Sequence, residues 1–369
     1  MKKLFLALFC CATLLGGAEL SIGDPAKELA DCSFLKGEKV QISGKNPTPT
    51  LLFFWSIGYA SNQELGKMIS AAQSYDQKLR IITIGCDDEA KLREFFLTKD
   101  IPFTVVSDNK LTNVNTYLRE KEQVPFCVIL TPDGKIAWRG PASQVAAPLK
   151  AIVDGKYDLA TAVRIDRYKS ALSEAMAKKD FNQALALTDA ELKHNPENLE
   201  LIVLSVNLLN KALGKPDVAQ KRLAELVKNH PRNVHFHEIY LRYLHLLHQR
   251  AEILQEADFA AKTFADEPAD LQKLISVETN FPVGEISPEA LLRLGKALHS
   301  VKKFPNERDH ALALLLYAKI LSYCNAPGAA LNVAMQAKCH LHDSKEIAEA
   351  DRMIAHYQEI LRLSRELQQ

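Results

Sequence analysis

Residues 51–62 decide the fold of this chain and read Leu-Leu-Phe-Phe-Trp-Ser-Ile-Gly-Tyr-Ala-Ser-Asn. The unbroken apolar run 51–55 predicts a central strand that is buried on both faces of a sheet. Beyond it, apolar side chains recur at i, i+3, i+4 and i+7, at Leu65, Met68, Ile69 and Ala72. This spacing predicts an amphipathic helix, and Ser61 and Glu64 have the spacing of a capping box at its start.

Strand-like and helix-like segments continue to alternate toward residue 157. Further strands are predicted at 80–85, 126–130 and 135–138, and further helices near 92–96, 111–118 and 145–153. The tripeptide Pro132-Asp133-Gly134 between the last two strands is a strong hairpin signal. The alternation predicts an α/β domain with a largely parallel sheet.

Several short motifs in this region occur in a fixed order: Gly23-Asp24-Pro25-Ala26, Leu52-Phe53-Phe54-Trp55, Ile101-Pro102-Phe103, Val124-Pro125-Phe126 and Thr131-Pro132-Asp133-Gly134-Lys135-Ile136. Together they resemble the TlpA-like and redoxin branch of the thioredoxin superfamily over about 130 residues. The resemblance implies a thioredoxin-like fold for residues 19–157. It also implies that Pro125 takes the place of the family's cis-proline, beside the active-site motif.

The same resemblance places the family's two catalytic cysteines at Tyr59 and Asn62, where this chain has no cysteine. The nucleophile of thiol–disulfide exchange is a thiolate, which neither side chain can replace. We therefore expect a degenerate, redox-inactive site. Thioredoxin-like domains bind extended peptides beside the cis-proline, so Trp55, Tyr59 and Pro125 are candidates for peptide contact. For Trp55, packing in the core is an equally good interpretation.

Two other cysteines leave an enzymatic alternative open, in which Cys86 or Cys127 serves as a displaced nucleophile of an oxidoreductase or peroxidase. Cys86 precedes Asp87-Asp88, and adjacent carboxylates oppose formation of a thiolate. Cys127 lies inside a predicted strand. Strands on either side of a central strand lie about 9–10 Å apart, beyond the separation of about 7 Å that a disulfide tolerates. Small buried hydrophobic residues are the simpler interpretation of both.

Residues 160–369 are predicted to be entirely helical. Phe181-Asn182-Gln183-Ala184 leads to Asn195-Pro196-Glu197-Asn198, and Pro216-Asp217-Val218-Ala219 leads to His230-Pro231-Arg232-Asn233. Pro196 and Pro231 are 35 residues apart, and Pro268 follows 37 residues later. This period resembles that of tetratricopeptide arrays, in which stacked helix pairs form a concave binding face. A plain helical bundle is the alternative.

Histidines are concentrated in one part of this helical region, at His230, His235, His237, His245 and His248. With a carboxylate such as Glu238 they are a conceivable metal site. Their spacing matches no metal-binding family, however, and helical surface or core positions explain them better. We expect no metal site and no cofactor.

The first 18 residues have the pattern of a signal peptide: the positive Met1-Lys2-Lys3, an apolar run from 4 to 15, and small residues at 16–18. The apolar run is too short to span a bilayer. Removal of this segment leaves an odd set of five cysteines, which is not a disulfide framework. The net charge of +1 argues against binding to nucleic acid or to a membrane surface.

These observations predict an exported protein, periplasmic or secreted, with no membrane span after cleavage. A redox-inactive thioredoxin-like domain (19–157) is joined to a tetratricopeptide-like helical domain (160–369). We expect the pair to act as a module that binds a protein or peptide partner, with the displaced-cysteine enzyme as the alternative.

Overall fold

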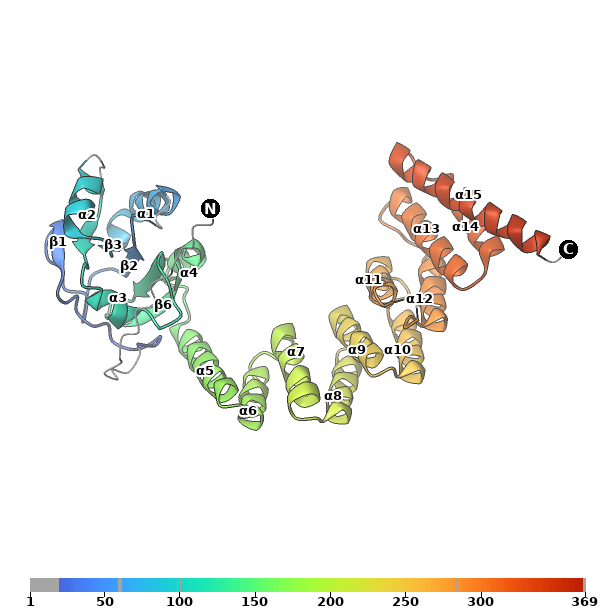
Figure 1. Ribbon diagram of the computed structural model, residues 1–369, viewed down its shortest axis with the longest axis horizontal. Helices are drawn as coiled ribbons and strands as arrows, with labels where there is room; N and C mark the ends of the chain where they lie inside the picture. Colours follow the sequence, from blue (N-terminus) through green and yellow to red (C-terminus); the bar gives the residue numbers. More distant parts are fainter. Residues whose placement is uncertain (1–19, 59–61, 98, 100, 283, 368–369) are drawn as a thin grey trace, which may run out of the picture. The chain divides into compact units, whose positions relative to one another are not determined.

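The computed structural model describes residues 20–58, 62–97, 99, 101–282 and 284–367. The predicted signal peptide lies outside these ranges. The chain divides into two compact units, Met1–Glu174 and Ala175–Gln369 (Figure 1). This division falls inside helix α5 (Leu159–Ala177), later than the boundary between the predicted domains 19–157 and 160–369.

The first unit is built on a six-stranded sheet of order β1-β4-β3-β2-β5-β6. Its strands are β1 (Ser33–Lys36), β2 (Thr50–Trp55), β3 (Arg80–Gly85), β4 (Thr104–Ser107), β5 (Phe126–Leu130) and β6 (Ile136–Pro141). Strand β2 lies between β3 and β5, and all of its residues are buried. The predicted central strand is therefore confirmed.

The expectation of a largely parallel sheet is wrong. Only the β2–β3 and β3–β4 pairs are parallel, whereas β1–β4, β2–β5 and β5–β6 are antiparallel. A parallel pair needs a crossover connection of a dozen residues or more, whereas an antiparallel pair can be closed by a short turn. The turn at Pro132-Asp133-Gly134 makes β5–β6 such a hairpin, and β1 pairs along the far edge in the opposite direction. The sheet is mixed.

Helices cover both faces of the sheet (Figure 1). The helices of this unit are α1 (Asn62–Tyr75), α2 (Glu89–Phe96), α3 (Thr112–Tyr117) and α4 (Ala146–Val153), with short 3-10 turns at Asp76–Lys78 and Ala142–Gln144. One core contains Leu51, Phe53 and Trp55 of β2 together with buried residues of α1, α2 and α4. The opposite core contains Leu52 and Phe54 with Tyr117 of α3. The period-2 alternation of β2 thus supplies both cores.

The second unit is helical throughout the residues that the structure describes within 175–369. Its elements after α5 are α6 (Phe181–Leu192), α7 (Leu199–Asn207) with a π-helical extension Leu208–Ala212, α8 (Pro216–Asn229), α9 (Val234–Leu246), α10 (Arg250–Thr263), α11 (Pro268–Thr279), α12 (Pro288–Ser300), α13 (Glu307–Tyr323), α14 (Pro327–Lys338) and α15 (Ser344–Glu366). We call this unit the helical array. Ala184 of α6 and Ala219 of α8 are fully buried, as expected where helices approach closely.

None of the helices in the described part of the chain combines the length and the apolar character that crossing a bilayer requires.

Candidate functional site

The first unit places its candidate site where β2, β3 and β4 end together. Trp55 pairs with Gly85, and Gly85 pairs with Ser107, so the residues that follow each strand lie at one edge of the sheet. Asp87 holds the turn after β2 at this edge. Its carboxylate accepts a hydrogen bond from the Ile57 N–H at 2.6 Å and another from the Ser56 hydroxyl at 3.1 Å. The backbone that leads into the degenerate motif is therefore fixed by an acid on the neighbouring strand end.

The two positions of the degenerate motif are known only from the sequence. Tyr59 lies outside the described residues, and helix α1 begins at Asn62, whose side chain is also outside them. Neither residue is a cysteine.

Trp55 occupies the core. Its side chain is fully buried, and its ring lies 5.3 Å from the Phe95 ring and 5.5 Å from the Phe96 ring, measured between centroids. Among the residues that the structure describes, the indole Nε1 has no hydrogen-bond partner. As the structure stands, Trp55 offers no exposed surface to a peptide, and it fulfils the core interpretation given above.

Pro125 lies next to the end of β2. The Val124–Pro125 peptide bond is cis, in agreement with the place that the family resemblance gives to Pro125. Phe126 pairs with Phe54, so Pro125 comes opposite the last residue of β2, and it is half-buried. Of the three peptide-contact candidates, Pro125 is the one that the structure describes with partly exposed surface.

The two candidate nucleophiles lie in surroundings that disfavour a thiolate. Burial, reinforced by the nearby carboxylates of Asp108 and Asp87, raises the pKa of Cys86 to about 12. Burial also raises the pKa of Cys127, whose side chain is fully buried in β5, and the charge of Glu64 adds to this effect. A group with a pKa far above the ambient pH supplies almost no nucleophile.

The sheet register also keeps these cysteines apart. Cys127 pairs with Phe53, whereas Cys86 follows Gly85, the partner of Trp55. The two Cα atoms are thus separated by two strand spacings across the sheet and three residues along it, which amounts to about 14 Å. A disulfide requires about 7 Å or less. Both cysteines are free thiols.

Cys32 is the third cysteine of this unit, and the structure places it immediately before β1. Ser33 pairs with Ser107, so Cys32 and Cys86 lie on opposite sides of Asp108, about 9–10 Å apart at two strand spacings. Burial, with the charge of Asp108, raises the pKa of Cys32 as well. These three cysteines therefore offer no pair within bonding distance and no thiol poised to ionise.

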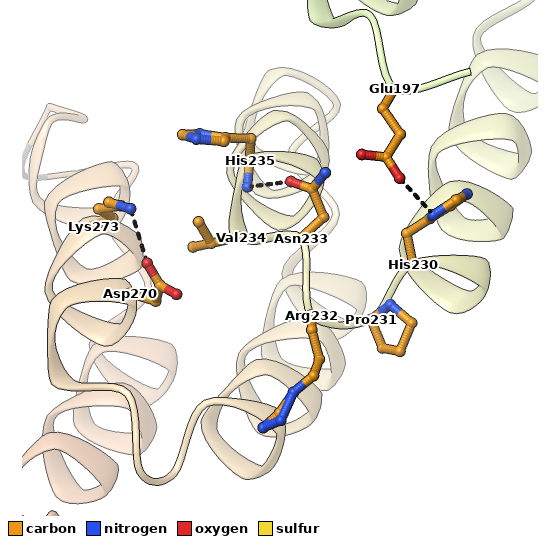
Figure 2. Close-up of a pocket in the computed structure, with 9 residues that line it drawn as sticks. All are labelled: Glu197, His230, Pro231, Arg232, Asn233, Val234, His235, Asp270 and Lys273. Carbon is orange, nitrogen blue, oxygen red and sulfur yellow. Dashed lines mark hydrogen bonds and ion pairs between the residues drawn. The ribbon is translucent and has the colours of Figure 1, made fainter. Parts of the chain in front are cut away.

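The helical array contains a polar pocket of about 530 Å³ at the starts of α9 and α11 (Figure 2). It is lined by Glu197, His230, Pro231, Arg232, Asn233, Val234, His235, Asp270 and Lys273. The turn 230–233 between α8 and α9 forms one wall, and the first turn of α11 forms another. Asn233 caps α9 by accepting a hydrogen bond from the His235 N–H at 3.2 Å, which fixes that wall.

Hydrogen-bond donors and acceptors lie side by side around this pocket. His230 lies 3.3 Å from a Glu197 carboxylate oxygen, and Lys273 lies 2.8 Å from Asp270. Arg232 pairs at 3.0 Å with Glu267, which is outside the pocket, and two thirds of the Arg232 side chain is exposed. Such walls present both donors and acceptors to a bound molecule, and they suit a polar peptide better than an apolar ligand.

The histidines predicted as a conceivable metal site do not converge. His235 is exposed and faces Glu238, whereas His237 is buried against Glu256, and His245 is buried against Glu278. Within the described residues, no group of three or more potential ligands is arranged to hold a metal ion.

Sequence reasoning missed the anchoring role of Asp87 and the pocket itself. The repeated Asn-Pro and His-Pro turns were the available signal, since they place Glu197 and the 230–233 turn at equivalent inter-helix connections. Nothing in the local sequence pattern showed that α11 forms the opposite wall of the pocket.

No protein-family model matches the chain, and no curated protein matches it. Solved structures do match its first part. They include StoA from Bacillus subtilis (19% identity, covering 33% of this chain and 99% of that chain, TM-score 0.27). A thioredoxin-like protein in the oxidised form matches at 19% identity over 38% of this chain and 97% of that chain, with a TM-score of 0.30. Peroxidoxin BcpB from Mycobacterium tuberculosis matches at 13% identity, over 37% and 96%, with a TM-score of 0.30. By its sheet order, register and helix placement, the first unit has a thioredoxin-like fold.

Proposed function

We propose that this chain is an exported binding protein, in which a redox-inactive thioredoxin-like unit accompanies a helical array that captures a polar peptide segment of a partner. The placement of the cysteines is the observation that supports a redox-inactive first unit. Positions 59 and 62 have none, and the sheet register holds Cys32, Cys86 and Cys127 beyond disulfide distance of one another.

The displaced-cysteine enzyme receives no support from these surroundings. A peroxidase or oxidoreductase needs a thiolate at neutral pH, and it usually needs a second thiol or an external reductant to complete its cycle. Cys86 and Cys127 both have a raised pKa, because burial and neighbouring carboxylates oppose the charge. Binding is the function that the geometry supports better.

The pocket of the helical array supports the proposal that the array captures a polar peptide. Its volume of about 530 Å³ suits a few residues of a peptide. Arg232 and Lys273 offer cationic donors, and Glu197 and Asp270 offer anionic acceptors. Backbone groups of an extended peptide need both kinds of partner, and tetratricopeptide-like arrays commonly bind such segments.

Export is supported by residues 1–18, which have the order of a signal peptide. Expression with this leader in a bacterial host, followed by N-terminal sequencing of the released protein, tests it. We expect a mature chain that starts near Glu19. Full retention of Met1 in the cytosol would contradict export.

The redox-inactive claim is tested by intact mass of the mature protein after equilibration in thiol buffers from reducing to oxidising, followed by acid quenching and alkylation of free thiols in denaturant. We expect all five cysteines to be alkylated at every poise. A reversible loss of two, mapped to one pair, would restore the enzyme alternative to first place.

Peptide capture is tested by screening a library of fluorescein-labelled dodecapeptides against the mature chain. We expect selected peptides to lose at least tenfold in affinity on Arg232→Ala. Arg293→Ala is the matched control, since Arg293 makes a similarly exposed ion pair with Asp258 at 3.1 Å and does not line the pocket. Equal effects of the two substitutions, or a screen with no binder, would rule out the pocket as the peptide site.

A further inference from the structure

The polar pocket opens onto the exposed faces of two helices, α9 and α11. His235 belongs to the first turn of α9, Lys273 belongs to the second turn of α11, and both line the pocket (Figure 2). Because one hollow receives both side chains, the exposed faces of the two helices open to the same side of the array.

The two helices run side by side in the same direction. Near their starts, His235 and Asp270 line one pocket, at an offset of 35 residues. Near their ends, the buried His245 lies 2.9 Å from the buried Glu278, at an offset of 33 residues. An offset that is nearly the same at both ends means that α9 and α11 are parallel and stay adjacent along their length. The pocket at their starts therefore continues into a surface along both helices.

Exposed side chains recur along this surface at helical spacing. On α9 they include His235, Arg242 and Leu246, at i, i+7 and i+11, and on α11 they include Lys273 and Ser276, at i and i+3. Positions with these spacings share one face of a helix. We call these five residues the α9–α11 strip.

Two members of the α9–α11 strip differ from the rest. Arg242 is exposed, and among the residues that the structure describes it makes no ion pair or hydrogen bond. Leu246 is an apolar side chain that is 55% exposed. By contrast, His235 and Lys273 each face a carboxylate of their own helix. The strip therefore adds one unpaired cation and one apolar contact to what the pocket offers.

The spacing of these groups fits an extended peptide. At a rise of about 1.5 Å per helical residue, Arg242 lies about 10 Å along α9 from His235, and Leu246 lies about 6 Å further. An extended chain advances about 3.3 Å per residue, so these distances correspond to about three residues and about two. Side chains two positions apart in an extended chain point to the same side. One face of the peptide can thus meet both Arg242 and Leu246.

We propose that the peptide site extends from the polar pocket along the α9–α11 strip, and that it selects segments in which an acidic and an apolar residue stand two positions apart. The acidic side chain faces Arg242, and the apolar side chain covers Leu246. The acid follows from charge complementarity, because an exposed guanidinium without a partner attracts a carboxylate. This inference rests on the proposed function and deepens it, since it specifies the sequence pattern of the partner.

The screen of fluorescein-labelled dodecapeptides also tests this pattern. Among peptides that bind the mature chain, we expect an Asp or Glu two positions from a Leu, Ile, Met or Phe, in either order. Binders in which this pairing is no more frequent than in the starting library would overturn the selection pattern.

Charge reversal at Arg242 tests the acidic contact directly. In fluorescence anisotropy titrations, we expect Arg242→Glu to weaken the best peptide about fivefold, and replacement of the peptide's acidic residue by lysine to restore binding to this variant. Arg167→Glu is the matched control, because Arg167 is an exposed arginine of α5 that makes no ion pair within the described residues. A loss that lysine does not restore, or an equal loss in the control, would overturn the contact between Arg242 and an acid.

Leu246→Ser tests the apolar contact. It should weaken the same peptide about threefold, because apolar area is no longer buried on binding. Met335→Ser is the control, since Met335 of α14 is 51% exposed and lies outside the strip. Circular dichroism checks that both variants are folded. Equal affinities of the two variants for the peptide would overturn the contact with Leu246.

The outcomes separate the strip from the pocket. Peptides that respond to Arg232→Ala but not to Arg242→Glu or Leu246→Ser would overturn the strip and leave the proposed function intact. Peptides that respond to Arg242→Glu and Leu246→Ser but not to Arg232→Ala would overturn the pocket as the peptide site and leave the strip in place. A screen without a binder would overturn both.

Discussion

The Arg119 guanidinium donates two hydrogen bonds, of 3.2 and 2.9 Å, to the carboxylate of Asp166, 47 residues further along the sequence. The same carboxylate accepts the Ile22 N–H at 3.0 Å, so one acid joins helix α5 to the segment before β1 and to the loop after α3. The first half of α5 thereby belongs to the thioredoxin-like unit. Burial alone would raise the pKa of Asp166, but the bonds from Arg119 and Ile22 outweigh it and lower that pKa.

Asp166→Asn should destabilise the first unit by about 1–3 kcal/mol, the usual range for losing hydrogen bonds to a charged group. Both tryptophans, Trp55 and Trp138, lie in this unit, so tryptophan fluorescence during urea unfolding reports on it selectively. Because the folded pKa of Asp166 is lowered, its contribution is present above about pH 4 and is lost as pH falls through the folded value. The difference from wild type should shrink in acid.

The control for this prediction is Asp154→Asn, which removes an exposed pair with Lys150. It should change the stability of the unit little, because exposed ion pairs contribute little. An equal loss in both variants would show that the Arg119–Asp166 contact has no special role.

Alkylation kinetics should separate the cysteines by environment. At pH 8 a thiol with a pKa of about 12 has a thiolate fraction on the order of a thousandfold below that of a free cysteine. Iodoacetamide should therefore modify the exposed Cys339 first, Cys86 far more slowly, and the buried Cys127 only on unfolding. Peptide mapping by mass spectrometry over time measures this order. Fast labelling of Cys86 in the folded chain would revive the enzyme alternative.

Two glycines with similar backbone angles should respond differently to alanine. Gly134 has φ +74° in the β5–β6 turn, and an added Cβ would lie 2.6 Å from the backbone nitrogen and oxygen of Gly44. Gly155 has φ +67°, and an added Cβ would meet nothing within 4 Å. Gly155→Ala should lower the free energy of unfolding by about 1 kcal/mol, because alanine disfavours the left-handed conformation. Gly134→Ala should lower it clearly more, because its added Cβ also meets the Gly44 backbone. Unfolding followed by tryptophan fluorescence compares them, and equal losses would contradict the close approach to Gly44.

Helix caps offer a test that separates folding from binding in the array. Asn233 caps α9 and Asn198 caps α7, each through a side-chain oxygen that accepts a backbone N–H. Replacement of either by alanine should cost about 1 kcal/mol of stability, measured by circular dichroism. Only Asn233 lines the pocket, so only Asn233→Ala should also weaken a selected peptide. Equal affinities for that peptide in the two variants would argue against a binding role for the pocket wall.

The local elements of this chain were predictable because they depend on short-range periodicity. The apolar run at 51–55 became β2, and the spacing after it became α1. The turn at Pro132-Asp133-Gly134 joined β5 to β6, since Gly134 adopts the positive φ that the turn needs. The direction of β5 beside β2 was not predictable, because no local pattern encodes which way a distant strand runs.

The candidate sites show the same division. The lack of cysteine at positions 59 and 62 is a property of the sequence alone. The burial of Trp55 against Phe95 and Phe96 is not, since it depends on how α2 packs on the sheet.

By itself, the sequence determined where strands β2, β3, β5 and β6 and helices α1 to α4 lie, and that positions 59 and 62 have no cysteine, whereas strands β1 and β4 became evident only in the structure. The tertiary structure alone decided that Cys86 and Cys127 stay apart and that His237 meets Glu256, 19 residues further on. The physical reason is that periodicity acts over one or two turns of chain, whereas sheet register and side-chain burial are set by packing between segments far apart in the sequence.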